Sequence, residues 1–239
     1  MFREESIWIK NALEKIHPTQ NIEVANIGSS TGYFRKVLQP HVHGNVMEPL
    51  NNSGWKVLHV DMKDEPGVDL VADVTKTNFS GKFSNRFGLT ICSNLLEHVE
   101  DIDLVIQNLV NITCNNGYIL ITVPNKYKIH YDPIDNGFRP TPFEIASRFL
   151  QLGNPINIVA EQIISIEEIG YYRVKKSRFP LWGYRERLKY HLGNRHKVAG
   201  ILLQVEKVNE VITYERKIHY RGQSKPMALK AIKNFFFLG

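Results

Sequence analysis

Small and acidic residues follow four consecutive apolar segments, an order typical of a nucleoside-binding edge. A loop with two glycines, residues 26–32, directly follows the β-branched segment 22–27. Glycines at a strand-to-helix turn let the backbone approach a ligand closely, and the amides of the following helix favour an anion. Asp61 follows the second segment, where its carboxylate could accept hydrogen bonds from two ribose hydroxyls. Asp73 and Ser93-Asn94 follow the third and fourth, although such residues are also common in ordinary turns.

A second group of residues has the chemistry for proton transfer. His98 follows the fourth segment, where an imidazole that titrates near neutrality could deprotonate or orient a hydroxyl, or could simply begin a helix. The proline-containing stretch 127–142 carries His130, Asp135 and Arg139. Arg139 could bind an anionic group of a substrate or pair internally with Asp132 or Asp135. The candidate catalytic residues are His98, His130, Asp135 and Arg139.

The elements that would position these residues alternate between strand and helix. This alternation predicts an α/β fold with a doubly wound, parallel sheet and helices on both faces. Pro40 and Pro124 are expected to end the elements that precede them. The strand candidates are 22–27, 55–60, 68–74, 87–92, 118–123, 156–166 and 198–205, and the helix candidates are 7–16, 33–38, 102–110 and 142–152.

Over about residues 22–141 the chain resembles the class I, Rossmann-like S-adenosylmethionine-dependent methyltransferases. The glycine loop, the segment 57–61, the segment 71–74 and the segment 87–101 with its Leu96-Glu97-His98-Val99 stretch carry the resemblance. It implies S-adenosylmethionine as cofactor and a seven-stranded, mostly parallel sheet whose last strand, at 198–205, is antiparallel. The cofactor-binding residues that it implies are Asn26, Gly28, Ser29, Gly32, Asp61, Met62, Asp73, Val74, Ser93 and Asn94.

The stretch 127–142 resembles a loop of bacterial methyltransferases associated with cell-surface sugar biosynthesis. That likeness favours a small-molecule or glycan hydroxyl as the methyl acceptor. A dehydrogenase is disfavoured, because the glycine spacing does not match GxGxxG and no second dinucleotide-binding half follows.

Two positions of the glycine loop depart from the family pattern. Asn26 stands where the family usually has an acidic residue, and Ser30 stands where it usually has a glycine. Gly28 and Asp61 are also farther apart than in a compact unit of roughly 20 residues. The excess is interpreted as a polar loop at 40–54, which could cover the cofactor or be an inert surface loop.

The net charge of +6 is concentrated in residues 171–197, which hold nine Lys and Arg residues against Glu186 alone. Basic and aromatic residues together suit nucleic acid, an anionic membrane surface or a phosphate-linked substrate, and they also suit a solvated helix that acts as a lid. The alternatives to O-methylation of a small acceptor are therefore an RNA methyltransferase and, given Asn26 and Ser30, a non-catalytic binding subunit.

The composition and the first residues of the chain indicate the class of protein, its location and its domain organisation. With 43% hydrophobic and 23% charged residues, the chain has a globular composition, and no apolar run approaches the roughly 20 residues of a membrane span. The acidic start lacks the pattern of a signal peptide, which predicts a cytoplasmic protein, with peripheral membrane contact possible. The predicted organisation is one domain at 1–208, with an inserted basic helical segment at about 171–197, and an extension at 209–239. Cys92 and Cys114 are expected to be buried thiols, and no metal site is expected.

Overall fold

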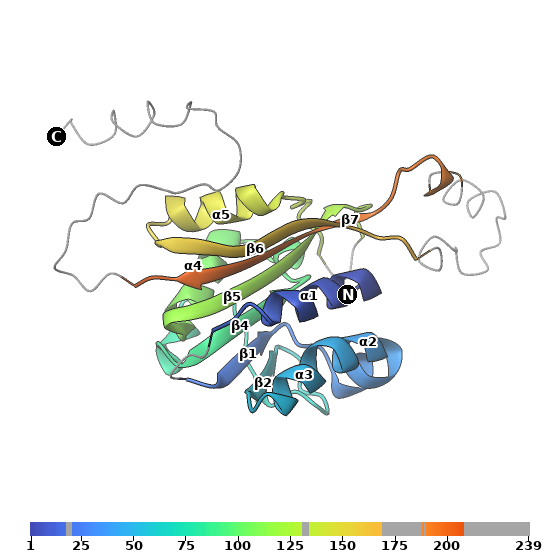
Figure 1. Cartoon of the computed structure of the whole chain (residues 1–239). Coiled ribbons are helices and arrows are strands. Elements are labelled where there is room, and N and C mark those ends of the chain that lie inside the picture. The colour runs from blue at the N-terminus through green and yellow to red at the C-terminus, as the bar shows by residue number, and fades with distance from the viewer. Residues whose placement is uncertain (18–20, 131–133, 169–187, 189, 208–239) are drawn as a thin grey trace, which may run out of the picture. The chain divides into compact units, whose positions relative to one another are not determined.

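The computed structural model describes residues 1–17, 21–130, 134–168, 188 and 190–207. Within these residues seven strands form one sheet in the order β3-β2-β1-β4-β5-β7-β6 (Figure 1). Strands β1 to β5 run parallel, and β7 runs antiparallel to both β5 and β6, as predicted. The strands are β1 (Glu23–Ile27), β2 (Lys56–Asp61), β3 (Leu70–Val71), β4 (Phe87–Ser93), β5 (Thr113–Lys126), β6 (Ile156–Ser165) and β7 (Lys197–Val205).

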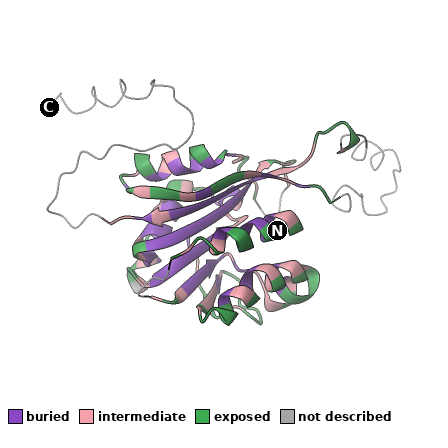
Figure 2. Cartoon of the chain, in the orientation of Figure 1, coloured by how far each residue is buried: buried purple, intermediate pink, exposed green. Residues whose placement is uncertain are grey.

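Helices cover both faces of the sheet, which confirms the doubly wound α/β prediction (Figure 1). One face packs against α1 (Arg3–Leu13), α2 (Pro40–Val42) and α3 (Glu48–Asn52), and the other against α4 (Ile102–Ile112) and α5 (Pro142–Gln151). Apolar side chains of β1, β4, β5 and β7 fill the space between the sheet and the helices on each face, so that the central strands are buried (Figure 2).

The polar loop predicted at 40–54 is helical instead. A π-helical turn (Phe34–Leu38), α2, a second π-helical turn (His43–Met47) and α3 follow one another with little interruption. Pro40 is the first residue of α2, a position where the missing amide has no intrahelical partner to lose, so the proline does not end the helical run. Val42, Val46 and Leu50 recur every four residues and are buried in the core.

Two predicted strand boundaries were wrong. The third strand contains only Leu70 and Val71, because the Asp73 carboxylate accepts a hydrogen bond from the Thr75 amide and turns the chain away. Pro124 does not end the fifth strand. β4 pairs only as far as Thr122, and Pro124 pairs with Val198 of β7 alone, next to a shift in register.

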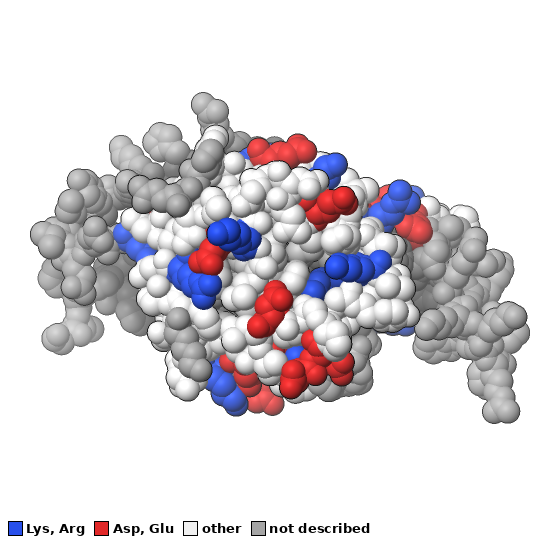
Figure 3. Space-filling model, turned by 90° about the horizontal axis from the view of Figure 1, so that it is seen from below, with Lys and Arg blue, Asp and Glu red and all other residues white. Residues whose placement is uncertain are grey.

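Residues Met1–Lys207 form one compact unit, and the predicted extension at 209–239 lies outside the described residues. The predicted basic segment at 171–197 also lies mostly outside them. On one face of the described part, acidic and basic side chains are interspersed (Figure 3). Every helix among the described residues is too short or too polar to cross a membrane. Within the same residues, no three His, Cys, Asp or Glu side chains are placed to bind a metal ion.

Candidate ligand-binding site

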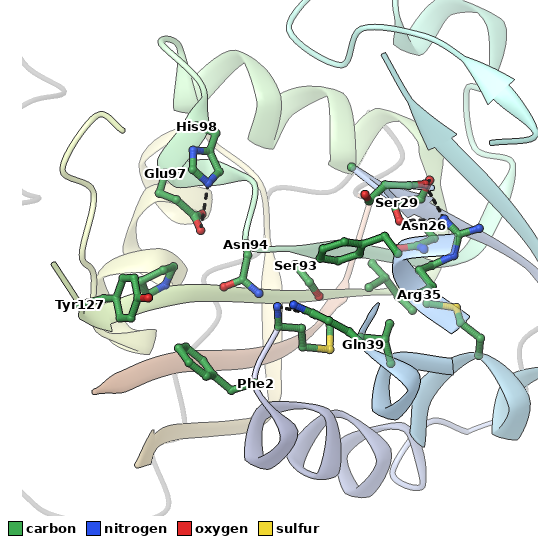
Figure 4. A pocket seen from close by; sticks show the side chains of 18 of the residues that line it. Phe2, Asn26, Ser29, Arg35, Gln39, Ser93, Asn94, Glu97, His98 and Tyr127 are labelled. Carbon is green, nitrogen blue, oxygen red and sulfur yellow. Dashed lines mark hydrogen bonds and ion pairs between the residues drawn. The ribbon is translucent and has the colours of Figure 1, made fainter. Parts of the chain in front are cut away.

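A cavity of about 480 Å³ opens at the carboxyl ends of β1, β4 and β5, the edge where open α/β sheets bind ligands. Figure 4 shows side chains from the glycine loop at one end of this cavity and Glu97, His98 and Tyr127 at the other. The lining residues are Met1, Phe2, Asn26, Gly28, Ser29, Ser30, Phe34, Arg35, Gln39, Val42, Met47, Ile91, Ser93, Asn94, Glu97, His98, Pro124, Tyr127 and His130.

The glycine loop turns through two residues in the left-handed region. Gly28 has φ +68°, and a Cβ there would lie 3.2 Å from the Leu95 side chain. Ser30 has φ 56°, at the position where the family usually has glycine. Its amide donates to Asp61 Oδ2 at 2.7 Å, a charge-assisted hydrogen bond that offsets the steric cost of this conformation.

Arg35 lies buried beneath the loop and holds it through backbone carbonyls. One guanidinium nitrogen donates to the oxygens of Ser29 (2.8 Å) and Ser30 (2.6 Å), and the other donates to the Gly67 oxygen at 2.5 Å. Burial lowers the pKa of Arg35, against the opposing influence of Asp69 and Asp61, but a guanidinium stays charged in proteins. Arg35 was not predicted from the sequence, because nothing in the local sequence distinguishes it from the exposed Lys36 beside it.

Asn26 is bound from the side by a neutral histidine. Its amide nitrogen lies 3.0 Å from His59 Nδ1 on the neighbouring strand β2. Burial, together with the nearby Arg35 charge, lowers the pKa of His59 to about 4, so this ring accepts the hydrogen bond as a neutral group. This bond uses the amide nitrogen, so Asn26 Oδ1 remains available as an acceptor.

Two buried side-chain oxygens, Ser93 Oγ in the middle of the cavity and Glu97 Oε2 at its other end, have no hydrogen-bond partner among the described residues (Figure 4). Glu97 is 1% exposed, and its other oxygen lies 3.8 Å from His98 Nε2. Burial, reinforced by the charge of Glu5, raises the pKa of Glu97 to about 8, although Arg139 acts in the opposite direction. Glu97 lies in the Leu96-Glu97-His98-Val99 stretch that resembles the family, but no role was predicted for it.

His130 is held by Asp135, whose side chain is covered completely. The Asp135 carboxylate accepts hydrogen bonds from the His130 ring (3.0 Å), the His130 and Gly137 amides (2.9 Å each) and Arg139 (2.6 Å). Burial alone would raise its pKa, but these bonds, that from Arg139 foremost, outweigh burial and hold the pKa of Asp135 well below its usual range. Arg139 thus pairs internally with Asp135, one of the two alternatives that the sequence left open.

The Glu5 side chain, from helix α1, holds the turn that follows β4. The local sequence around Glu5 gives no sign of this role. Its carboxylate is fully buried and accepts hydrogen bonds from the Phe2 amide (3.0 Å), Asn94 Nδ2 (2.7 Å) and Thr122 Oγ1 (2.6 Å). Asn94 adopts φ 50°, and the bond to Glu5 holds its side chain in that turn.

No protein-family model and no curated protein sequence matches this chain. Several solved structures are similar in fold. The (4+2)-cyclase SpnF has a TM-score of 0.56 at 11% identity, with 85% of this chain and 81% of that chain covered. A methyltransferase from Archaeoglobus fulgidus that depends on S-adenosylmethionine has a TM-score of 0.54 at 14% identity, with 84% and 94% covered. A geranyl diphosphate C-methyltransferase from Streptomyces coelicolor, in complex with S-adenosylhomocysteine, has a TM-score of 0.52 at 11% identity, with 84% and 79% covered.

The chain has the class I methyltransferase fold. Because one of these neighbours is a cyclase, the fold does not determine which reaction a protein catalyses. The reaction has to be inferred from the side chains of the site.

Within this methyltransferase fold, the cavity brings together seven of the residues predicted from the sequence. They come from both predicted groups and are Asn26, Gly28, Ser29, Ser93, Asn94, His98 and His130. Asp135 and Arg139 lie behind His130 and do not line the cavity.

The remaining predicted cofactor residues do not line the cavity. Asp61 binds the Ser30 amide, and Met62 is mostly exposed. Gly32 packs against a neighbouring turn, since a Cβ on Gly67 would lie 2.6 Å from the Gly32 Cα. Asp73 caps a turn at Thr75, which together with Lys76 lowers its pKa, and Val74 is buried in the core. Their part in cofactor binding stays a prediction.

Proposed function

We propose that this chain is an S-adenosylmethionine-dependent methyltransferase that methylates an oxygen of a small-molecule or sugar acceptor. The observation that carries the proposal is a single cavity lined by the glycine loop at one end and by Glu97, His98 and His130 at the other. Its volume of about 480 Å³ lies within the range of small-molecule sites. Two neighbours in fold are named as methyltransferases, one of which holds S-adenosylhomocysteine.

The loop end of the cavity fits this cofactor. Gly28 keeps the cradle open where a side chain would meet Leu95, and the buried Ser93 Oγ offers an unused hydrogen bond. Asn26 Oδ1 can accept a hydrogen bond from an amino group, although without the charge of a carboxylate. Asn26, Gly28, Ser29, Ser93 and Asn94 would therefore hold the cofactor, whose sulfonium supplies an electrophilic methyl group.

The imidazole end suits an acceptor that must lose a proton. The His98 and His130 rings stack with centroids 5.1 Å apart, and both line the cavity. In this proposal they orient the acceptor hydroxyl, while Asp135 and Arg139 act as positioning residues that fix His130. Orientation matters because methyl transfer requires nucleophile, methyl carbon and sulfur in line.

Calorimetry with S-adenosylmethionine and S-adenosylhomocysteine tests the cofactor. We expect binding by the wild type and a loss of affinity of at least tenfold in Gly28→Ala, where the new Cβ crowds Leu95 at a positive φ. Gly81→Ala is the matched control, because a Cβ there meets nothing within 4 Å. Absence of binding at millimolar cofactor would contradict the proposal and favour a non-catalytic subunit.

The acceptor is tested by measuring S-adenosylhomocysteine formed with a panel of hydroxyl compounds that includes catechols, glycosides and nucleotide-linked sugars. Formation that depends on the added compound, with the methyl group found on oxygen, is the expected result. Methylation found only on nitrogen or carbon would overturn the oxygen assignment while leaving the methyltransferase proposal intact.

A further inference from the structure

Glu97 is a buried acid that lines the cavity with half of its hydrogen-bonding capacity unused. It lies in the 3-10 turn Leu96–His98 that leaves β4, and Oε2 has no partner among the described residues. An unpaired buried carboxyl oxygen is costly, and such groups in native proteins commonly serve a ligand or a reaction. Figure 4 shows the Glu97 carboxyl group on the cavity side of the turn, next to His98.

The hydrogen bonds of His98 determine which of its nitrogens faces Glu97. Nδ1 contacts the Ile134 carbonyl oxygen, which can only accept, so Nδ1 carries a proton. Nε2 is then the nitrogen that can accept a hydrogen bond, and it lies 3.8 Å from Glu97 Oε1. A lone pair and a carboxylate at that separation repel each other unless a proton lies on one of them. The two groups therefore form a pair, called the dyad below, in which a protonated Glu97 can pass its proton to His98.

Solvent access differs within the dyad. Glu97 is 1% exposed, whereas the His98 side chain is 19% exposed. A proton taken up by Glu97 inside the cavity thus has a route to water through His98. The ionisable groups that act on Glu97 from neighbouring elements are Glu5, Arg139, the Cys92 thiol and the amino group of Met1.

We propose that Glu97, in its ionised form, is the catalytic base of the reaction, accepting the proton of the acceptor hydroxyl at Oε2 and returning it to solvent through His98. The O–H bond of the acceptor breaks and its proton moves to Glu97. The freed electron pair on oxygen forms the new C–O bond, and the electron pair of the broken methyl–sulfur bond stays on sulfur. This inference rests on the proposed function and adds a base that the sequence analysis did not assign.

The same geometry selects the substrate class. A carboxylate acceptor needs no base, whereas a hydroxyl must lose its proton, so a buried carboxyl group with an unpaired oxygen in the cavity favours a hydroxyl acceptor. A neutral hydroxyl can instead donate to Oε2 and satisfy it. Phe2 and Tyr127, whose ring centroids lie 5.7 Å apart, add an aromatic wall beside His130 that suits the flat face of a ring. The site is therefore built for a neutral, ring-bearing hydroxyl compound.

The first test needs neither cofactor nor acceptor. Wild-type protein labelled with ¹³C at glutamate carboxyl carbons is titrated by NMR, and the Glu97 signal is the one missing from Glu97→Gln. We expect this signal to titrate near pH 8, and the ring of His98 to shift with it in the wild type but not in the variant. A Glu97 signal that titrates at the ordinary glutamate pKa would overturn the inference.

The second test measures methyl transfer to the best hydroxyl compound of the panel, and to benzoate and glucuronate as carboxylate probes. Glu97→Gln should lower kcat at least 100-fold while S-adenosylhomocysteine binds within threefold of the wild type. Glu97→Asp should recover part of the loss, and Glu100→Gln, an exposed carboxylate three residues away, should change nothing. Two results would overturn this inference and leave the proposed function intact. One is methyl transfer by Glu97→Gln within threefold of the wild-type rate, and the other is preferred methylation of the carboxylate probes. A wild type that binds cofactor and methylates no compound would overturn the proposed function and this role with it.

Discussion

The two ends of the cavity are built on opposite principles. At the glycine-loop end the polar side chains are bound to protein: Asn26 contacts His59, Arg35 donates to three carbonyl oxygens, and Asp61 accepts from Ser30. At the imidazole end, Glu97 keeps a buried oxygen that has no partner in the described part of the chain, as does Ser93 between the two ends (Figure 4). The first end is a preformed cradle, while the second keeps hydrogen-bonding capacity unused in the folded chain. Because unpaired buried groups cost stability, the comparison predicts that the imidazole end destabilises the fold where it serves a reaction.

The largest effect should appear in the pH dependence of stability at Glu97. Its pKa is raised from 4.5 to about 8, so the folded state holds a proton that the unfolded chain releases above pH 4.5. Stability is therefore lost as pH rises from 4.5 to 8, by about 5 kcal/mol in total at 1.36 kcal/mol per pKa unit. Urea unfolding measured between pH 4.5 and 8 should show that the free energy of unfolding of Glu97→Gln increases relative to that of the wild type as the pH rises. Parallel curves for the two proteins would mean that the carboxyl group is solvated.

At the opposite end, Arg35→Met should be nearly as damaging. The variant leaves the carbonyl oxygens of Ser29, Ser30 and Gly67 without these donors, and with roughly 1.5 kcal/mol per charge-assisted bond it should lose up to about 4.5 kcal/mol of unfolding free energy. The Kd for S-adenosylhomocysteine should rise as well, because the loop loses its support from below. Lys36→Met is the matched control, since the neighbouring lysine is exposed. Equal urea midpoints for the two variants would show that Arg35 does not hold the loop.

The same contrast explains how much of the site could be predicted from the sequence. Gly28, Ser93 and Asn94 were predicted and line the cavity, because strand ends and glycine turns are local features that fix their own place in a parallel sheet. Arg35 and Glu97 were not predicted, because a charged residue gives no local sign that it will be buried. Arg35 bonds to Gly67, which is distant in the chain, and the pKa of Glu97 depends on Glu5 and Arg139, which are distant as well.

The fold was predicted well where one residue pattern dominates. β4, α4 and β7 match their expected ranges closely, since continuous apolar runs and helical spacing specify them. The segment 40–54 was misjudged because Pro40 was taken as a stop, although proline is equally suited to begin a helix. The spacing of Val42, Val46 and Leu50 was the signal that would have corrected it.

His59 gives the glycine-loop end a pH response of the opposite sign. The pKa of His59 is lowered from 6.5 to about 4. Between these two pH values the unfolded chain binds a proton at His59 and the folded state does not. Stability is present above pH 6.5 and lost as pH falls to 4, by about 3 kcal/mol at 1.36 kcal/mol per unit. His59→Gln should remove this acid-side slope in urea unfolding, whereas His17→Gln, at an exposed histidine, should keep it. A slope unchanged in His59→Gln would assign the acid sensitivity to other groups.

The smallest effect separates positioning from binding at the imidazole end. Asp135→Asn removes the charge that holds both His130 and Arg139, so His130 should lose its fixed orientation without leaving the cavity. We expect kcat to fall about tenfold, equivalent to roughly 1.4 kcal/mol of transition-state stabilisation, with the Kd for S-adenosylhomocysteine unchanged. Asp64→Asn, at an exposed aspartate, is the matched control. A weaker Kd with an unchanged kcat would instead connect the Asp135 loop to the cofactor end, and the two ends would then have to be treated as one coupled site.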